Sequence, residues 1–369
     1  MSNVAQDLAQ YALKCADIMI PKPGTDLTKW AVVACDQYTS EPEYWEQAAD
    51  YVKNDPSTLH LIYPEVFLEE ADPKKRISSI NSAMQSYIKN GIFTTYQNCF
   101  FLVHRTTDNC PNGRWGLLVT LDLEHYDYAK DSRTLIRATE GTILSRIPPR
   151  KEIRRNAPLE LPHIMVLIND EKRSVIEPLT KKTELLEKAY DTELMAGGGH
   201  LSAWVVDRQE DLEAIAQAVK AMHDALDPSN PLLFAMGDGN HSLATAKSCW
   251  MDIKQTLSGE ALQTHPARYA LVELENIFDP GLEFEPIHRV LFNLTKETFL
   301  QEIAKVCTSY IEKKVLSKEE VVAQINVNDG LQKFGYCDAD GCSVIVLQQP
   351  KASIAAGTLQ LVIDSLLAH

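Results

Sequence analysis

The sequence predicts an α/β protein built on a mixed sheet, with an α+β arrangement as the alternative. Two observations predict this class. Short apolar runs that end in turn-forming residues, typical of buried strands, alternate with segments whose apolar residues recur at helical spacing. The chain also has 369 residues, of which 45% are hydrophobic, so it can bury a large core. No internal repeat or low-complexity stretch interrupts the alternation.

The expected elements follow this pattern along the chain. An amphipathic helix is expected within residues 1–20, because apolar residues recur there at helical spacing. Turn formers, proline at a helix start and period-two runs place the remaining elements before residue 286. Strands are expected at 30–35, 99–105, 115–121, 161–168, 203–206 and 231–236, and helices at 41–52, 74–89, 210–226 and 242–255.

A smaller α/β region is expected after Pro286, with helices near 296–307 and 318–325, a hairpin from 331 to 347, and a final helix. Typical domain sizes suggest three parts. These are an N-terminal α/β region at 1–130, a catalytic core at 131–292 and a C-terminal α/β region at 293–369.

The net charge of −15 argues against nucleic acid as a partner, because such a chain repels phosphates unless its cations gather on one face. The longest apolar runs fall far short of the roughly 20 residues that span a bilayer. We see no export signal at the N-terminus and therefore expect a cytoplasmic protein without a membrane partner.

The eight cysteines are scattered and form no CxxC pair. This distribution favours free thiols in a reducing compartment over disulfides or a zinc site. Cys337 and Cys342 could bridge a hairpin, which is the less favoured alternative.

The strongest local signal is the turn Gly237-Asp238-Gly239-Asn240-His241-Ser242, where an apolar strand is expected to run into a helix. Backbone N–H groups and the helix dipole at such a position attract an anion, and the two glycines permit a close approach. His241 can donate to a phosphate oxygen or transfer a proton, and Asp238 can hold Mg²⁺ or accept a hydroxyl proton. An ordinary turn with capping residues has the same composition, so both interpretations stay open at this point.

This segment resembles the signature Asp-Gly-His-His-Arg of a widespread prokaryotic family long catalogued as a domain of unknown function. Two further stretches are similar to elements of that family: Arg137-Ala138-Thr139-Glu140-Gly141-Thr142 and Glu285-Pro286-Ile287-His288-Arg289. The family is similar in turn to the ParB/sulfiredoxin superfamily, to which free serine kinases belong. The chain departs from the signature at Asn240 and Ser242, where the family has His and Arg.

The resemblance implies a ParB/sulfiredoxin-like core and a phosphotransferase that converts free L-serine to O-phosphoserine. It also implies Mg²⁺ and a pyrophosphate, ADP or ATP donor. The phosphate-binding residues would be Gly239, Asn240, Ser242, Thr142, His288 and Arg289. The chain contains no Walker A or kinase Gly-rich motif, and it lacks the signature arginine after His241, so we favour pyrophosphate. The alternatives are a phosphoserine phosphatase at the same site and a non-enzymatic ParB-like nucleotide-binding adaptor.

An arginine-rich segment runs from Arg133 to Arg155 in this acidic chain. Arg137, Arg150 and Arg154 are expected to converge on the same anion as the turn, because guanidinium groups bind phosphate oxygens in pairs. The alternative is a solvated basic face with surface ion pairs.

Four other residues are candidates for the site. Glu140, among these arginines, would stay ionised and act as the base, or it is simply an acidic residue at a helix start. His200 follows three glycines and is a candidate for substrate binding, with a plain loop as the alternative. Asp36 and Tyr38 follow the first expected strand, where α/β proteins often bind ligands, and are candidate substrate contacts as well.

Overall fold

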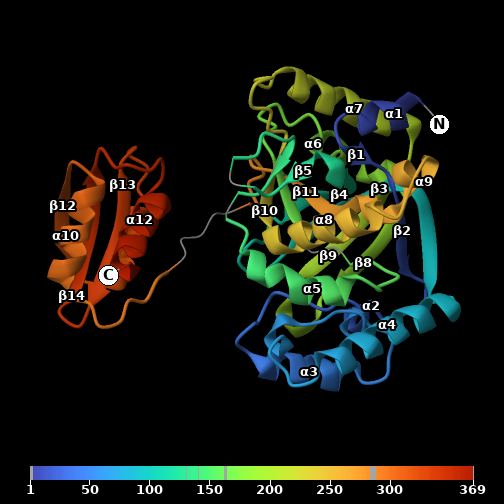
Figure 1. Cartoon of the computed structure of the whole chain (residues 1–369), viewed down its shortest axis with the longest axis horizontal. Coiled ribbons are helices and arrows are strands. Elements are labelled where there is room, and N and C mark those ends of the chain that lie inside the picture. Colours follow the sequence, from blue (N-terminus) through green and yellow to red (C-terminus); the bar gives the residue numbers. More distant parts are fainter. Residues whose placement is uncertain (1–2, 130, 140, 162–163, 283–287, 369) are drawn as a thin grey trace. The chain divides into compact units, whose positions relative to one another are not determined.

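The computed structural model describes residues 3–129, 131–139, 141–161, 164–282 and 288–368. The chain divides into two compact units, Met1–Leu282 and Glu283–His369 (Figure 1). The expected division at residue 130 does not separate units, because strands from both sides of it pair in one sheet. The expected boundary at 292 falls a short way past the end of the first unit at Leu282.

The first unit contains an 11-stranded mixed sheet among the described residues, which confirms the α/β class. Its main path is β5-β6-β10-β7-β11-β4-β3-β9-β8, with β1 paired to β4 and β2 paired to β3. The strands are β1 (Leu13–Lys14), β2 (Ala16–Pro21), β3 (Phe93–Thr106), β4 (Arg114–Asp122), β5 (Tyr126–Asp127), β6 (Ile136–Arg137), β7 (Met165–Ile168), β8 (Lys188–Glu193), β9 (His200–Val206), β10 (Phe234–Asp238) and β11 (Tyr269–Asn276).

Helices surround this sheet. Figure 1 shows α1 and α7 at one end of the unit in this view and α2, α3 and α4 at the opposite end. The helices are α1 (Asn3–Ala9), α2 (Leu27–Trp30), α3 (Pro42–Val52), α4 (Pro73–Lys89), α5 (Ile147–Arg154), α6 (Glu177–Thr180), α7 (Gln209–Asp224), α8 (Asn240–Lys254) and α9 (Glu260–Thr264). Short 3₁₀ helices lie at Thr58–His60, Glu65–Phe67, Leu123–His125, Leu144–Arg146, Thr183–Leu185, Met195–Gly197 and Pro266–Arg268.

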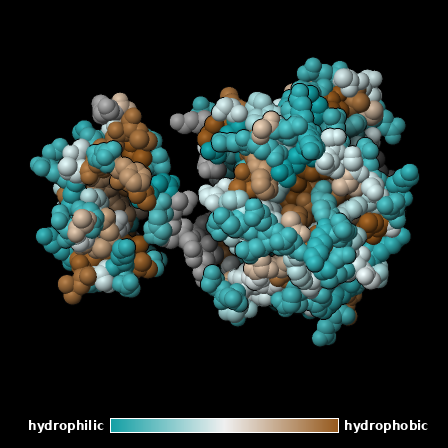
Figure 2. Space-filling model, turned by 90° about the horizontal axis from the view of Figure 1, so that it is seen from below, coloured by the Kyte–Doolittle hydropathy of each residue, from teal (hydrophilic) through white to brown (hydrophobic). Residues whose placement is uncertain are grey.

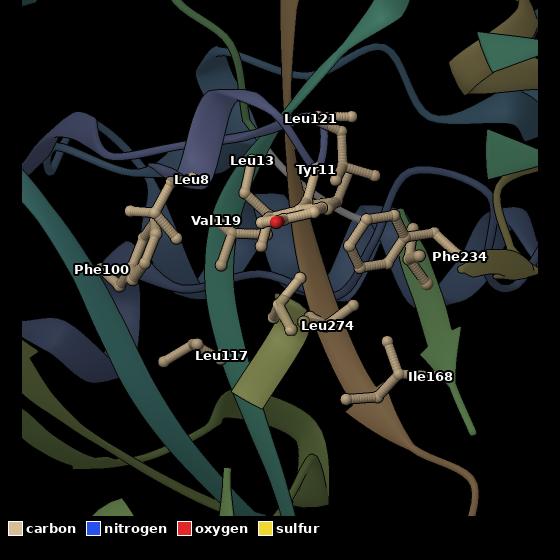
Figure 3. Close-up of a cluster of buried hydrophobic side chains, with 14 of the residues drawn as sticks. Leu8, Tyr11, Leu13, Phe100, Leu117, Val119, Leu121, Ile168, Phe234 and Leu274 are labelled. Carbon is tan, nitrogen blue, oxygen red and sulfur yellow. The ribbon is translucent and has the colours of Figure 1, made fainter. Parts of the chain in front are cut away.

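The main core packs on one face of the sheet. Leu117, Val119 and Leu121 of β4 lie beside Leu274 of β11 in this core, with Leu8 of α1 (Figure 3). Because side chains alternate between the faces of a strand, the residues between these leucines project from the opposite face. That opposite face carries the polar groups described below.

The second unit is a three-stranded antiparallel sheet of order β12-β14-β13 with helices on both faces. Apolar residues of α10 and α12 pack on one face and Val321 of α11 packs on the other. The elements are α10 (Lys296–Val306), β12 (Ser309–Val315), α11 (Lys318–Ile325), β13 (Gln332–Asp338), β14 (Gly341–Gln348) and α12 (Ala355–Leu367).

The hairpin β13–β14 carries a disulfide between Cys337 and Cys342, which are paired across the two strands. The expectation of free thiols throughout is therefore wrong for this pair, because a cross-strand register brings the two side chains together. The other six cysteines are free.

Most expected elements are confirmed, and two expectations are wrong. The stretch 30–35 is not a strand: α2 ends at Trp30, and the Trp30 carbonyl accepts hydrogen bonds from Ser57 and Thr58 at 3.2 and 2.7 Å. The N-terminal helix ends at Ala9, and Ala16–Pro21 forms β2 against β3. In both places contacts with a distant segment outweigh the local apolar pattern.

Figure 2 shows hydrophilic residues over much of the visible face of the first unit and several apolar patches on that of the second. Exposed apolar side chains of the second unit include Phe292, Leu316 and Leu367. Among the described residues, no helix combines the length and the apolar character that crossing a membrane requires.

Candidate functional site

The turn between β10 and α8 has the geometry of an anion site. Gly239 is the N-cap of α8 in the left-handed conformation, with φ 80° and ψ 28°. The first helical bond runs from the Leu243 N–H to the Gly239 carbonyl at 3.0 Å, so α8 begins directly after Gly239. The Asp238 carboxylate accepts from the Gly239 N–H at 2.7 Å, and its side chain is exposed.

Gly239 is required by both its backbone and its surroundings. A Cβ at this position would lie 3.2 Å from the Cα of Ile164 and 3.2 Å from its Cγ1. An L-residue would also be strained at this positive φ. The positive φ and the close contact with Ile164 thus explain why the turn has a glycine at this position.

The segment that follows β6 packs directly on the turn. The Thr139 hydroxyl donates to the Met236 carbonyl at 2.7 Å, and the Thr139 N–H donates to the buried Asn240 side chain at 3.3 Å. Asn240, expected to bind phosphate, therefore also positions this segment. The candidate base Glu140 lies outside the described residues.

His241 is oriented by the same segment. Its Nε2 accepts a hydrogen bond from the Ile143 N–H at 3.2 Å, so the ring proton is on Nδ1 in this arrangement. Thr142 directly precedes Ile143 in the chain, and its hydroxyl is buried without a hydrogen-bond partner among the described residues. Three of the expected site residues, Asp238, His241 and Thr142, are thus close to one helix end.

Arg137 does not join them. Its guanidinium donates to the Ser132 carbonyl at 3.2 Å, to the Asn230 side chain at 2.8 Å and to the Pro231 carbonyl at 3.3 Å. These acceptors precede the start of β10, whereas the turn follows its end. The expectation that Arg137 reaches the anion is therefore not met; the side chain ties two loops together instead.

Arg150 and Arg154 are occupied by carboxylates of the protein. Arg150 forms an ion pair with Glu65 and also donates to the Arg146 carbonyl at 3.0 Å, while Arg154 pairs with Glu160 at 2.8 Å. The expected convergence on the anion is replaced by ion pairs, the alternative considered for a charged segment.

Helix α5 also packs against α8. Lys151 of α5 pairs with Asp252 of α8 at 2.7 Å and donates to Ser248 at 3.0 Å. The arginine-rich segment thus holds α8 in place.

The loop with Asp36 and Tyr38 lies next to Glu65, the ion-pair partner of Arg150. The Glu65 N–H donates to the Cys35 carbonyl at 2.7 Å. Burial raises the pKa of the Cys35 thiol to about 12, so it stays protonated. Tyr38 has φ 50° and stacks on Tyr44, with ring centroids 3.9 Å apart.

A charge cluster that the sequence reasoning missed lies on the sheet face opposite the main core. We call Arg105, Arg114, Glu273 and Glu275 the charge cluster. Arg114 contacts Glu275 at 2.8 Å and Glu273 at 3.3 Å. Glu273 and Glu275 alternate with buried Val272 and Leu274 along β11, and that alternation was the available signal.

Glu275 is completely buried. Burial, reinforced by the neighbouring Glu273 carboxylate and opposed by Arg114, raises the pKa of Glu275 to about 9. Burial thus favours the protonated form of the Glu275 carboxyl. Arg105 is a further cation of the charge cluster, and the charge of Arg114 acts on it.

The charge cluster and the turn are neighbours in the sheet. Asp238 of β10 is in register with Met165 of β7, and Met165 is in register with Glu273 of β11. The register shifts by a β-bulge between Met236 and Asp238, and two strand spacings amount to about 10 Å. The backbones of Asp238 and Glu273 therefore lie in one row of the sheet.

The structure does not bring His200 to this face. The His200 ring donates to the carboxylates of Glu193 at 2.7 Å and of Asp191, on the rim of β8 and β9. It is in register with Thr106, so it projects from the face opposite Arg105, five positions along the sheet from β10. His288 and Arg289 are exposed residues of the second unit, and the site described here is built from the first unit alone.

No group of three or more His, Cys, Asp or Glu side chains arranged to hold a metal ion occurs in the described parts of the chain. Mg²⁺ needs fewer ligands from the protein, because it usually binds one or two carboxylates together with substrate phosphates. The exposed Asp238 at the helix end fits that role.

Comparison with known proteins gives one match. A family model described as "Protein of unknown function (DUF1015)" matches residues 19–366. Among curated proteins and solved structures, no match to the chain was found. The family signature in the turn had already indicated a family of unknown function, and this part of the expectation is confirmed. Because the match covers most of its length, the chain belongs to the DUF1015 family.

Proposed function

We propose that this protein is a phosphotransferase that transfers a phosphoryl group to the hydroxyl of a small metabolite, free L-serine in the first instance. The proposal rests on the N-terminal end of α8. There Gly239 is the N-cap, Asp238 directly precedes it and His241 lies in the first turn of the helix. Phosphoryl transfer needs mainly positioning and charge neutralisation, and a helix N-terminus provides both for a phosphate. The acceptor and the relation to free serine kinases come from the resemblance of the signature motifs.

The residues at this turn have distinct roles in the proposal. Backbone N–H groups at 240–242 and the Thr142 hydroxyl hold the donor phosphate. Asp238 holds Mg²⁺, which neutralises charge on the donor oxygens when bound. His241 donates from Nδ1 to the phosphate, since its Nε2 is occupied by the Ile143 N–H. Either Asp238 or Glu140 receives the proton of the acceptor hydroxyl.

We favour pyrophosphate as the donor. Ser242 stands where the signature has arginine, and a smaller cradle suits a donor without a nucleoside. The arginines of α5 add no cation at the turn, because Glu65 and Glu160 bind them. The donor charge is therefore balanced by the helix end, His241 and Mg²⁺ in this proposal.

The test is direct. Purified protein is incubated with L-serine and Mg²⁺ plus pyrophosphate, ADP or ATP, and O-phosphoserine is followed by ³¹P NMR. We expect product with pyrophosphate and much less with either nucleotide. Product with ATP or ADP alone would overturn only the choice of donor. Release of phosphate from O-phosphoserine with no forward reaction would favour the phosphatase alternative.

His241→Gln is the matched variant. A glutamine oxygen can accept from the Ile143 N–H in place of Nε2, so the segment stays in position while the imidazole is lost. We expect turnover to fall about 100-fold, within the usual contribution of a positioned proton donor. His223→Ala is the control, because His223 packs on Tyr11 of α1 away from the turn. Unchanged turnover in His241→Gln would remove His241 from the mechanism.

A further inference from the structure

Arg105 carries a charge that the fold leaves largely unbalanced. It is half-buried, and its Nη2 donates to the Gly198 carbonyl at 3.1 Å. Within the described ranges its Nε has no hydrogen-bond partner, and no carboxylate forms an ion pair with it. Arg114, the neighbouring cation, is the one that contacts Glu273 and Glu275.

An arginine in this state is expected to have a ligand. The guanidinium stays charged at all ordinary pH values, and burying it with few hydrogen bonds is costly. Burial and the charge of Arg114 both lower the pKa of Arg105, which reflects the same unfavourable environment. A carboxylate matches its planar fork, which can bind it through two parallel hydrogen bonds.

Two tyrosines lie close to this guanidinium. Tyr38 and Tyr44 both act on the charge of Arg105, and they stack with an interplanar angle of 7°. Tyr38 holds a positive φ, a conformation that a bulky residue rarely adopts without a constraint. The pair is a flat aromatic surface that interacts electrostatically with Arg105.

Glu273 supplies the opposite charge in the same cluster. Its side chain lies over Gly116, where an added Cβ would be 2.3 Å from its Oε1. Its contacts with Arg114 are long, at 3.3 and 3.4 Å, and the side chain keeps 22% of its surface exposed. Glu273 can therefore accept hydrogen bonds from a ligand ammonium group as well.

We propose that Arg105 and Glu273 bind the carboxylate and the ammonium group of an α-amino acid, and that this is the acceptor subsite. The second half of this inference rests on the proposed function, whereas amino-acid binding itself does not. The placement suits it, because Glu273 is in the same row of the sheet as Asp238 at the donor turn. The amino acid would lie along one face, with its side chain directed to the helix end.

Binding of ligand fragments tests the assignment without any turnover. Isothermal titration calorimetry is performed with L-serine, glycine, ethanolamine and 3-hydroxypropionate. We expect Arg105→Met to weaken the affinity for L-serine by about 10- to 100-fold, which is the effect of a lost charged hydrogen bond. The affinity for ethanolamine, which has no carboxylate, should be unchanged. Glu273→Gln should weaken L-serine and leave 3-hydroxypropionate unchanged. Arg155→Met and Glu152→Gln are the controls, since this exposed pair lies on α5.

A second pair of variants separates binding from folding. Arg105→Lys keeps the positive charge but loses the planar guanidinium group. It should weaken the affinity for the same ligands as Arg105→Met does, by a smaller factor. Gly116→Ala changes no charge but displaces the Glu273 carboxylate, so it should reproduce the Glu273→Gln pattern. Circular dichroism establishes that each variant is folded.

The outcomes are distinct. Equal weakening of L-serine and ethanolamine by Arg105→Met would show a merely structural role and overturn the inference, as would wild-type protein that binds neither L-serine nor glycine. Fragment-specific losses without any phosphoryl transfer would support the subsite and refute the proposed function. Transfer to L-serine that is unaffected by Arg105→Met would uphold the proposed function and refute the subsite.

Discussion

Gly239→Ala tests the donor turn through stability first. The left-handed conformation of Gly239 costs an alanine about 1–2 kcal/mol. The new Cβ would also lie 3.2 Å from the Ile164 Cα, and the Ile164 carbonyl is held by the Glu273 N–H at 2.9 Å. Because this backbone cannot easily move, overpacking adds about 1–3 kcal/mol. We therefore expect the free energy of unfolding to fall by about 2–5 kcal/mol, from these two contributions.

Gly24→Ala is the matched control for that measurement. Gly24 also has a positive φ, 96°, but an added Cβ would meet nothing within 4 Å. This variant should lose only the conformational part, about 1–2 kcal/mol. All five tryptophans precede residue 283, so fluorescence during urea unfolding reports on the first unit. A shifted midpoint at constant slope measures each loss. Equal losses for the two variants would refute the close packing of the turn on β7.

Three other variants test separate parts of the interpretation. Arg137→Met should lower the free energy of unfolding by about 1.5–3 kcal/mol, through lost charged hydrogen bonds, and leave pyrophosphate affinity unchanged by calorimetry; weaker affinity with unchanged stability would return Arg137 to the site. The pKa of Glu275 is raised by burial, so it binds a proton more tightly in the folded protein, and its contribution to stability is lost as pH rises from about 4.5 to about 9. Glu275→Gln should remove up to about 1.4 kcal/mol per pH unit of that decline in urea unfolding; parallel pH profiles would contradict it. Thr142→Val should raise the free energy of unfolding by about 1 kcal/mol and weaken pyrophosphate binding about threefold, whereas unchanged binding would exclude the hydroxyl from the site.

Locally determined elements could be predicted from the sequence. Residues 74–89 form α4 because Asp72 caps the Lys75 N–H at 3.2 Å and Pro73 suits the first helical position. The glycine turn before α8 could also be predicted, because an apolar strand, two glycines and a helical segment follow one another within a few residues. Signals of this kind need no knowledge of distant parts of the chain.

Roles that depend on distant partners could not be predicted in this way. Arg150 looked like a phosphate ligand, but its carboxylate partner Glu65 is 85 positions away. The charge cluster joins β3, β4 and β11, which become neighbours only through the order of the sheet. A charged residue in a sequence thus gives the chemistry that is available, whereas the fold decides which charges are already paired.

The unpaired groups are therefore the more informative ones. Folded proteins satisfy most buried polar atoms, and each exception requires a specific cause. Within the part of the chain that the structure describes, the Thr142 hydroxyl has no hydrogen-bond partner, and neither does the Arg105 Nε in the charge cluster. Asp238 and Glu273 lie in one row of the same sheet. In our proposal, a ligand with a phosphate at one end and an amino acid at the other would give both the Thr142 hydroxyl and the Arg105 Nε a hydrogen-bond partner. Pyrophosphate and serine together form such a ligand during phosphoryl transfer. An unsatisfied buried group destabilises the protein without its ligand. Thr142→Val should therefore stabilise the fold and at the same time weaken the binding of the ligand. Stability and binding that moved in the same direction at Thr142 would show that its hydroxyl has another purpose.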